Sequence, residues 1–306
     1  MLKAVTVTND LGEELRIELS LAGAMETGIA ITNIEGIGAG DADIYTQETA
    51  SSDGSTFSSS RAKERNIVIY ASLLQSPTVE DVRHKTYRYF PKKKKVTLRF
   101  ETDLRVCDID GYVENNEANI FEEQETIQIS IICPYPYFYS AGEGKEVLTV
   151  FYGIEPTFEF PFSNESLDEN LIVFGEIRNR AENNIYYNGD ADVGIVMYIR
   201  AMGTASNITL YNIETRESMT IDTDKLTSMT GKGLSAGDEI IVSTVKNDKY
   251  IRLLRDGIYT NILNCLNKES DWLELTPGDN LFAYTADSGA ENLQFWVTNK
   301  TLFEGV

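Results

Sequence analysis

Histidine and cysteine are scarce in this 306-residue sequence, which contains a single histidine, His84, and three cysteines. One histidine excludes a histidine-rich metal site, and a Ser-His-Asp triad would have to use His84 itself. The cysteines Cys107, Cys133 and Cys265 are odd in number, far apart in the sequence and fit no zinc-binding spacing. We therefore expect no metal, no cofactor and no disulfide framework, in a protein that folds in a reducing cytoplasm.

Long hydrophobic runs are also absent. No stretch of about 18 apolar residues occurs, so we expect no membrane span. The segment MLKAVTVTNDLGEE has one lysine and turns acidic before any long apolar core, so we expect no signal peptide. With 42% hydrophobic and 25% charged residues, the composition is that of an ordinary soluble protein, and 306 residues suffice for two domains.

Basic residues are in the minority: the sequence has 27 Lys and Arg against 48 Asp and Glu, which gives a formal net charge of −21. This charge argues against general binding to nucleic acids or to anionic membranes. Residues 61–105 are an exception, with 12 of the basic residues, 5 of the acids and a local charge of +7. The basic segment is either a solvated helix and turn or a surface that contacts acids of another subunit, such as a neighbouring copy of the chain.

The first part of the chain has an α+β pattern of mostly antiparallel strands and one helix. Residues 1–25 predict a hairpin whose second strand runs to Leu21, and residues 66–74, apolar on both faces, predict a central strand. A helix is predicted from the cap Thr78 to Pro91. Its stripe toward the core comprises Val79, Val82, Thr86 and Tyr89.

Residues 36–66 have no core pattern. They begin with GIGAGD at Gly36–Asp41 and continue through a stretch rich in Ser, Thr, Gly and charge. The Gly-x-Gly-x-x-Gly spacing of a dinucleotide loop fails at Asp41, and no amphipathic helix follows, so we interpret the glycines as a flexible turn. Because so long a segment without apolar periodicity is unusual inside a domain, we predict an extended arm at about residues 40–64.

A change of pattern near residue 139 predicts a domain boundary. Ile127, Ile129, Ile131 and Cys133 alternate with mostly polar residues, as in a half-buried strand. Two prolines then end the strand, because proline cannot donate to a strand ladder. We predict domains at 1–139 and 140–306. The elbow between them comprises Pro134, Tyr135, Pro136 and Tyr137.

Beyond the elbow, short alternating runs separated by turn residues predict an antiparallel β-sandwich. Asn261–Leu266 predicts a single helical turn. The predicted strands are Leu148–Tyr152, Gly194–Ala201, Asn207–Ile213, Met219–Ile221, Glu239–Thr244, Tyr250–Leu254, Leu281–Ala286 and Leu293–Thr298.

The sequence singles out no catalytic or ligand-binding set. Asp108–Gly111 lacks the spacing and flanking helices of a calcium loop and is interpreted as a turn between strands. Trp272 and Trp296 could form a sugar platform, but tryptophans of a sandwich more often belong to the core or an interface. A pair of carboxylates for glycoside hydrolysis is left open by 48 acids, and no pair stands out. We therefore expect no enzyme.

Several segments, in this order, resemble the distal tail proteins of long-tailed bacteriophages, known as Dit. In the first domain the resemblance rests on Arg65–Ile69, TVEDVRHKTYRYFPKKKKVTLRFETD, Gly111–Glu114 and ISIICPYPYF. In the second domain it rests on Phe158–Phe162, Tyr186–Gly194, Gly237–Ile251, Asp271–Asp287 and the segment LFEGV.

The resemblance implies a mainly β protein, with an N-terminal split-barrel-like belt domain containing one helix and a C-terminal galectin-like β-sandwich. It also implies a structural hub of the virion tail, a homohexameric ring assembled in the cytoplasm of the bacterial host. Such a ring joins the major tail tube protein to a tail-tip or tail-associated lysin protein, can carry receptor-binding proteins, and leaves room for DNA to pass without specific binding. The alternatives are a carbohydrate-binding module for host adhesion and a tail-associated hydrolase.

The basic segment supplies the candidate contacts between subunits. Four consecutive lysines follow the predicted helix stop at Pro91 and form a corner before the next strand. Within a chain that is acidic elsewhere, this corner is the most obvious complement for the acids of a neighbour. The candidate interface residues are Arg65, Arg88, Tyr89, Lys92, Lys93, Lys94 and Lys95.

Overall fold

The computed structural model describes residues 1–306 except 49–52, 122–123, 143–144, 156–175 and 180. The chain forms two compact units, the first made of Met1–Lys145 with Leu302–Val306 and the second of Glu146–Thr301. The elbow at Pro134–Tyr137 therefore lies within the first unit, and the chain returns to that unit after completing the second. In the described part of the chain, no helix is long and apolar enough to span a membrane.

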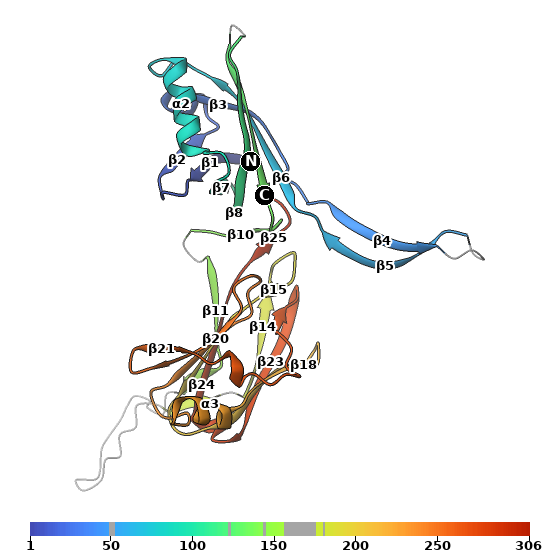
Figure 1. Ribbon diagram of the computed structural model, residues 1–306, viewed down its shortest axis with the longest axis vertical. Coiled ribbons are helices and arrows are strands. Elements are labelled where there is room, and N and C mark those ends of the chain that lie inside the picture. The colour runs from blue at the N-terminus through green and yellow to red at the C-terminus, as the bar shows by residue number, and fades with distance from the viewer. Residues whose placement is uncertain (49–52, 122–123, 143–144, 156–175, 180) are drawn as a thin grey trace, which may run out of the picture. The chain divides into compact units, whose positions relative to one another are not determined.

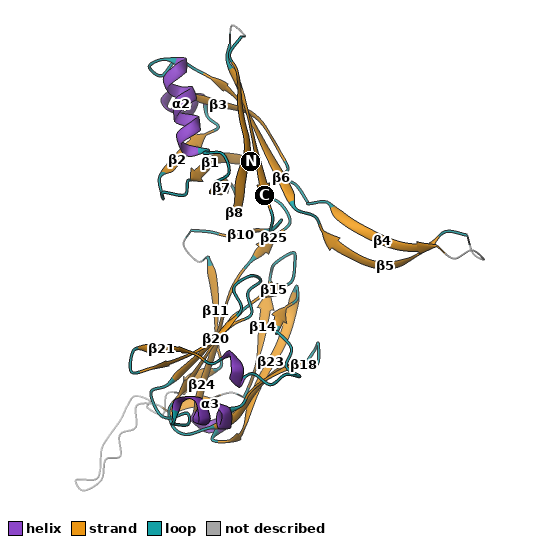
Figure 2. Cartoon of the chain, in the orientation of Figure 1, coloured by secondary structure: helices purple, strands orange, loops and turns teal. Residues whose placement is uncertain are grey.

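The first unit is built on a nine-stranded sheet, shown in Figure 1 and Figure 2. Seven strands follow the order β2-β1-β7-β8-β9-β6-β3, and two short strands, β10 and β25, pair with each other beside β8. All of these pairings are antiparallel, and the predicted strand at 66–74 is confirmed as a central one. The strands are β1 (Leu2–Thr8), β2 (Glu14–Glu18), β3 (Ile29–Glu35), β6 (Arg65–Leu73), β7 (Lys95–Thr102), β8 (Val106–Asn119), β9 (Thr126–Cys133), β10 (Phe138–Ser140) and β25 (Leu302–Phe303).

The long helix of this unit, α2 (Val79–Tyr89), packs on the sheet as its sequence pattern predicts. Val82 and Thr86 are buried, and the Thr78 hydroxyl accepts a hydrogen bond from the Asp81 amide at the N-cap. At the other end, the Asn116 side chain of β8 donates to the Thr86 and Phe90 carbonyls, at 3.3 and 3.4 Å. The Thr86 carbonyl also accepts a hydrogen bond from the Phe90 amide at 2.8 Å, so the Asn116 side chain joins the C-terminal end of α2 to the sheet.

A second helix occurs where the sequence predicts the end of a strand. The hairpin of β1 and β2 is confirmed, but β2 ends at Glu18 and is followed by α1 (Leu21–Thr27). The Ser20 side chain accepts a hydrogen bond from the Gly23 amide at the N-cap, and Gly28, with φ at 79°, ends the helix. The cap signals outweigh the continued alternation of leucines, so the prediction of one helix in this unit was wrong.

The predicted turn at Asp108–Gly111 was also wrong, because these residues lie inside β8. Both carboxylates bond to basic residues of the neighbouring strand β7. Asp108 accepts two hydrogen bonds from Arg99, at 2.8 and 2.9 Å, and Asp110 forms an ion pair with Lys95 at 2.9 Å. Such cross-strand charge pairs stabilise a strand whose composition alone favours a turn.

The second unit contains two main antiparallel sheets, as expected for the predicted sandwich. Each predicted run overlaps a strand of this unit, whereas β13, β14, β21 and β22 were not predicted. The six-stranded sheet contains, in order, β11 (Glu146–Val150), β24 (Leu293–Lys300), β16 (Val196–Ala201), β19 (Glu239–Ser243), β20 (Tyr250–Arg255) and β21 (Ile258–Asn261). The four-stranded sheet contains β14 (Glu182–Tyr187), β23 (Gly278–Ser288), β17 (Ser206–Asn212) and β18 (Glu217–Ile221).

The core of this unit lies between its two sheets. Alternate residues of β23 and β24 are buried, and the rings of Tyr284 and Phe295 lie 5.6 Å apart. The Tyr284 hydroxyl donates a hydrogen bond to the Leu293 carbonyl at 3.2 Å, so its polar end is satisfied inside the core. The smaller elements are β12 (Tyr152–Glu155) paired with β13 (Glu176–Asn179), β15 (Val193–Gly194) paired with β22 (Glu274–Leu275), the predicted helical turn η1 (Leu263–Cys265), and η2 (Ala290–Asn292).

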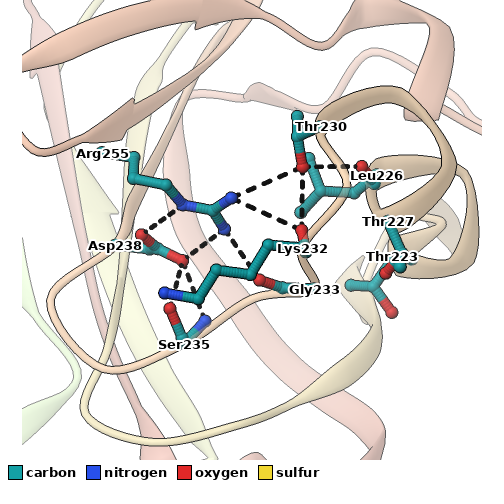
Figure 3. A network of polar contacts seen from close by, with 9 residues as sticks. All are labelled: Thr223, Leu226, Thr227, Thr230, Lys232, Gly233, Ser235, Asp238 and Arg255. Atoms are coloured by element: carbon teal, nitrogen blue, oxygen red, sulfur yellow. Dashed lines mark hydrogen bonds and ion pairs between the residues drawn. The ribbon is translucent and has the colours of Figure 1, made fainter.

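A third helix, α3 (Thr223–Thr230), was not predicted. Asp222 caps its first turn, and a buried ion pair holds the loop that follows it, as Figure 3 shows. Arg255 of β20 donates to both oxygens of Asp238, at 2.8 and 2.7 Å, and to the Gly233 carbonyl at 2.7 Å. The same carboxylate accepts hydrogen bonds from the amide and hydroxyl of Ser235. This network ties the end of α3 to the six-stranded sheet.

Candidate functional site

The predicted arm is a β-hairpin that extends away from the sheet of the first unit (Figure 1). It comprises β4 (Ala42–Glu48) and β5 (Ser55–Ala62), and its tip at 49–52 lies outside the described residues. Three large apolar side chains are exposed on it: Ile44 at 66%, Tyr45 at 47% and Phe57 at 62%. A two-stranded hairpin that buries so little is marginally stable by itself, and its exposed apolar surface makes it the candidate functional site.

Ion pairs hold the two strands of the arm together close to the sheet. Asp43 of β4 lies 3.2 Å from the Arg61 guanidinium and 3.1 Å from the Lys63 ammonium. A hydrogen bond from Lys63 has the largest influence and lowers the pKa of Asp43. Burial opposes it, and a hydrogen bond from Arg61 lowers the pKa further. The Lys63 amide also donates to the Asp41 carbonyl at 2.9 Å. The strands of the arm are therefore paired up to the point where they leave the sheet.

Arg65 lies at the root of the arm and is only 6% exposed. Its Nε donates to the Pro136 carbonyl at 2.7 Å, its Nη1 to the Gly36 carbonyl at 2.7 Å and to the Gly38 carbonyl, and its Nη2 to the Glu304 carbonyl at 2.7 Å. Burial lowers its pKa from the usual value, although a guanidinium stays charged. The sequence nominated Arg65 as an interface residue, and the structure places its donors on main-chain oxygens of its own unit.

The glycine-rich segment Gly36–Gly40 surrounds this guanidinium. Gly36 has a φ of 81°, and a Cβ there would lie 2.1 Å from the Asn66 carbonyl oxygen, so only glycine fits. A Cβ on Gly40 would lie 3.0 Å from Nη2 of Arg65. The predicted flexible turn is thus a segment shaped around a cation.

The basic corner at Lys92–Lys95 is exposed and partly neutralised by acids of the same unit. Lys94 pairs with Asp10 at 3.1 Å, and Lys95 pairs with Asp110. Within the described part of the chain, Lys92 and Lys93 form no ion pair. Of the four lysines of the corner, Lys92 and Lys93 therefore carry charges that no acid of the described residues pairs with.

The other two nominated residues, Arg88 and Tyr89, lie at the end of α2. Arg88 forms two hydrogen bonds with the Glu13 carboxylate, one of them 2.8 Å long, and lies over the Tyr89 ring at 5.8 Å. Hydrogen bonds from Arg88 and Asn9 lower the pKa of Glu13 to about 2. Tyr89 is half-buried against the core. The structure thus brings these residues close to the turn between β1 and β2, apart from the arm root at Arg65.

The elbow contacts Arg65. The rings of Tyr135 and Tyr137 meet edge to face at 5.4 Å, and Pro134 is exposed. Pro136 is buried, with its carbonyl bonded to Arg65. After the elbow, the strand β10 pairs with β8 and β25, so the chain remains in the first unit as far as Lys145.

Groups that carry chemistry in other proteins have structural contacts here. Burial raises the pKa of the Cys107 and Cys133 thiols to about 12, which makes them poor nucleophiles at neutral pH. Trp296 is half-buried and stacks on Tyr198 at 5.3 Å, and Lys249 lies 5.0 Å from the ring of Trp272. Among the described residues, no group of three or more His, Cys, Asp or Glu side chains could hold a metal ion.

No protein-family model and no curated protein sequence matches the chain. Several solved structures are similar to it, and the two described here match over nearly its whole length. The crystal structure of the SPP1 Dit (gp 19.1) protein, described as a paradigm of the hub adsorption apparatus in phages that infect Gram-positive bacteria, has a TM-score of 0.67 and 13% sequence identity. It covers 98% of this chain and 100% of the SPP1 chain.

The second structure is a chain of the phage p2 baseplate in its activated conformation with Sr. It has a TM-score of 0.50 and 9% identity, and it covers 98% of this chain and 99% of the baseplate chain. Both matches span the two units of the chain, and the resemblance inferred from the sequence motifs is thereby confirmed at the level of the fold. The motif at Phe158–Phe162 lies outside the described residues. The chain has the fold of the phage distal tail, or Dit, proteins.

Proposed function

We propose that this protein is a structural hub of a phage tail, a closed homohexameric ring at the distal end of the tail tube. The observation that carries the proposal is the exposed hairpin arm with Ile44, Tyr45 and Phe57 on its surface. The similarity to the fold of the SPP1 hub protein supports it. The ring would join the major tail tube protein to a tail-tip or tail-associated lysin protein and could carry receptor-binding proteins, with no catalysis required.

The arm suits a ring because it makes a contact that is not self-complementary. If the arm of one subunit lies on the first unit of the next, each copy uses two different surfaces, and such a contact generates a ring when its rotation closes. The first unit, predicted as the belt domain at residues 1–139, would form the ring. The sandwich, predicted as galectin-like, would then be left for other tail proteins.

The negative net charge of the chain should make assembly of the ring depend on the salt concentration. Six copies would carry a formal charge of −126, six times −21. Repulsion of this size is weakest where salt screens it, so we expect the ring to be less stable at low ionic strength. Basic residues that meet acids of a neighbour would offset part of the repulsion locally.

Electron microscopy and native mass spectrometry of the full chain at several salt concentrations test the proposal. We expect rings of six copies whose fraction rises with ionic strength and with protein concentration. Monomers under all conditions, with no ring even when the tail tube protein is present, would contradict it. A monomer that binds specific glycans on an array would instead support the alternative, a carbohydrate-binding module for host adhesion.

The basic corner gives a prediction on the interface itself. Changing Lys92 and Lys93 to Glu should strongly reduce ring assembly, because these lysines have no ion pair within the described part of their own chain. Lys94 and Lys95 are left unchanged, since they already bind acids of the same unit. Exposed substitutions of this kind cost about 0.5 kcal/mol or less, so the melting temperature of the single chain should hardly change. Light scattering and thermal melting measure the two effects.

The matched control changes Lys232 and Lys268 to Glu, two exposed lysines of the second unit. It alters the net charge of the chain by the same amount at a different place. If both double variants reduce assembly equally, total charge rather than the basic corner is responsible. If the Lys92 and Lys93 variant assembles with unchanged salt dependence, the corner is only a solvated turn.

A further inference from the structure

The guanidinium of Arg65 joins segments that are far apart in the sequence. Its acceptors lie in the segment leading into the arm, at Gly36 and Gly38, in the elbow at Pro136, and beyond β25 at Glu304. Arg65 is itself the first residue of β6, where the chain returns from the arm. Both ends of the arm therefore meet at one side chain.

The segment after β25, residues 304–306, also contacts the root of the arm. The Val306 amide donates to the Ile37 carbonyl at 3.0 Å, beside the bond from Arg65 to Glu304. A Cβ on Gly305 would lie 3.2 Å from the Gly38 carbonyl carbon, so the two backbones are in close contact there. β25 is held in turn by its pairing with β10 and by Leu302, which is buried.

The contacts of Arg65 explain why an arginine is needed at this position. Arginine has five N–H donors in a planar fork, whereas a lysine ammonium has three donors at one point. In the described part of the chain, Arg65 has no carboxylate within ion-pair distance. Its guanidinium contacts main-chain carbonyls and lies 4.8 Å from the centre of the Phe138 ring. A buried cation of this kind is satisfied only when all of its acceptor segments are in place.

We propose that Arg65, the segment Gly36–Gly40 and the segment Leu302–Val306 form a latch that fixes the direction in which the arm leaves the sheet. The occupant that requires a fixed direction is a second copy of this chain, so the inference rests on the proposed ring. A hairpin held in one direction loses less freedom on binding than a hairpin free to swing, and it reaches the same place on every neighbour. Arg65 acts as a positioning residue and is not itself part of the contact with the neighbour.

The latch also connects the arm with the chain that leaves the second unit. Leu302 directly follows Thr301, the last residue of that unit in the sequence. Opening of the latch would leave Nη2 of Arg65 without an acceptor beside a cavity of about 270 Å³ lined by Asp41, Arg61 and Tyr137, among others. The arm is thus rigid while Leu302–Val306 is in place and mobile when that segment is displaced.

The test measures the direction of the arm within one chain by pulsed electron paramagnetic resonance. Spin labels are placed at Thr56→Cys on the arm and Leu104→Cys on the body of the first unit, both exposed positions. The three native cysteines are buried and remain unlabelled. Ile44→Ser and Phe57→Ser are included so that no arm is held by a neighbour. We expect a narrow distance distribution that becomes at least twice as wide in Arg65→Lys.

The control is Arg61→Lys, an exposed arginine four residues away that pairs with Asp43, and it should leave the distribution narrow. A second variant, Gly305→Val, disturbs the latch from the other side without changing Arg65. It should widen the distribution equally and speed hydrogen exchange of the Val306 amide at least tenfold. Melting curves identify a variant that fails to fold, in which case the other variant decides.

An unchanged distribution in folded Arg65→Lys and Gly305→Val chains would overturn the latch. This outcome is distinct from failure of the proposed function, because ring formation is measured separately on the chain without the arm substitutions. A wide distance distribution in the Arg65→Lys and Gly305→Val chains, together with normal rings of the same variants without the arm substitutions, would show that the latch exists and that assembly does not need it. A narrow distance distribution in both variants, together with normal rings, would support the proposed ring and contradict the latch.

Discussion

Changing Ile44 and Phe57 to serine is expected to abolish assembly while leaving the fold of each subunit intact. Both side chains are mostly exposed in the single chain, so their loss removes almost no core contact. Covering each one at an interface contributes roughly 1.5–3 kcal/mol, and two per contact correspond to about a 100- to 10,000-fold change in the assembly constant. Sedimentation velocity over a range of protein concentrations measures this shift.

The matched control for the arm is the pair Thr46→Ser and Thr56→Ser, exposed polar positions on the same two strands. These changes should leave both assembly and melting temperature as they are in the unaltered protein. If the Ile44 and Phe57 variant formed rings at the original concentration, the arm would not be the contact between subunits. A large drop in its melting temperature would show instead that the arm supports the fold of its own chain.

The arm could be predicted from the sequence because its signal is local. A long segment between strands without apolar periodicity cannot be part of a core, whatever its partners. Its hairpin structure was not predicted, since Ser and Thr dominate β5 and only the pairing with β4 fixes the strand. The exposed Ile44 and Phe57 could have been noticed as apolar residues with no core to join.

The latch could not be predicted, because its contacts are distant in sequence and its acceptors are main-chain carbonyls. Arg65 reaches Pro136 across 71 residues and Glu304 across 239 residues. Carbonyl oxygens are the same in every residue type, so no pattern of side chains marks them. The glycines at 36, 38 and 40 were the one available signal, and comparison with a phosphate-binding loop led to their interpretation as a flexible turn.

Local signals were in conflict where the predicted elements were wrong. The leucines before α1 continue the period of a strand, whereas Ser20 and Gly28 cap a helix, and the caps prevail. At Asp108 the composition of a turn is outweighed by Arg99 on the neighbouring strand. In the sandwich, the period of two predicted most strands, but it could not assign each strand to one of two sheets, because both sheets bury alternate residues.

The largest stability effect is expected at the ion pair of Asp238 and Arg255 in the second unit (Figure 3). Changing Asp238 to Asn keeps the volume of the side chain but leaves the largely buried guanidinium of Arg255 without a counter-charge. Breaking a buried pair from one side costs roughly 3 kcal/mol, which lowers the melting temperature of a domain of this size by about 6–12 °C. The longer pair of the exposed Arg200 and the partly buried Glu239, 3.8 Å apart, provides the control, since Arg200→Gln should cost less than about 1 kcal/mol.

The same pair predicts a pH dependence with a definite sign. Burial alone would raise the pKa of Asp238, but hydrogen bonds from Arg255 and Ser235 outweigh it, and the pKa is lowered in the folded protein. A carboxylate with a lowered pKa stabilises the fold above its unfolded pKa of about 4, and this contribution is lost as the pH falls through the folded value. The unaltered protein should therefore lose more stability between about pH 5 and pH 3 than Asp238→Asn does. Denaturant unfolding of both proteins across this range measures the difference, and parallel curves would show that Asp238 does not carry this pH dependence.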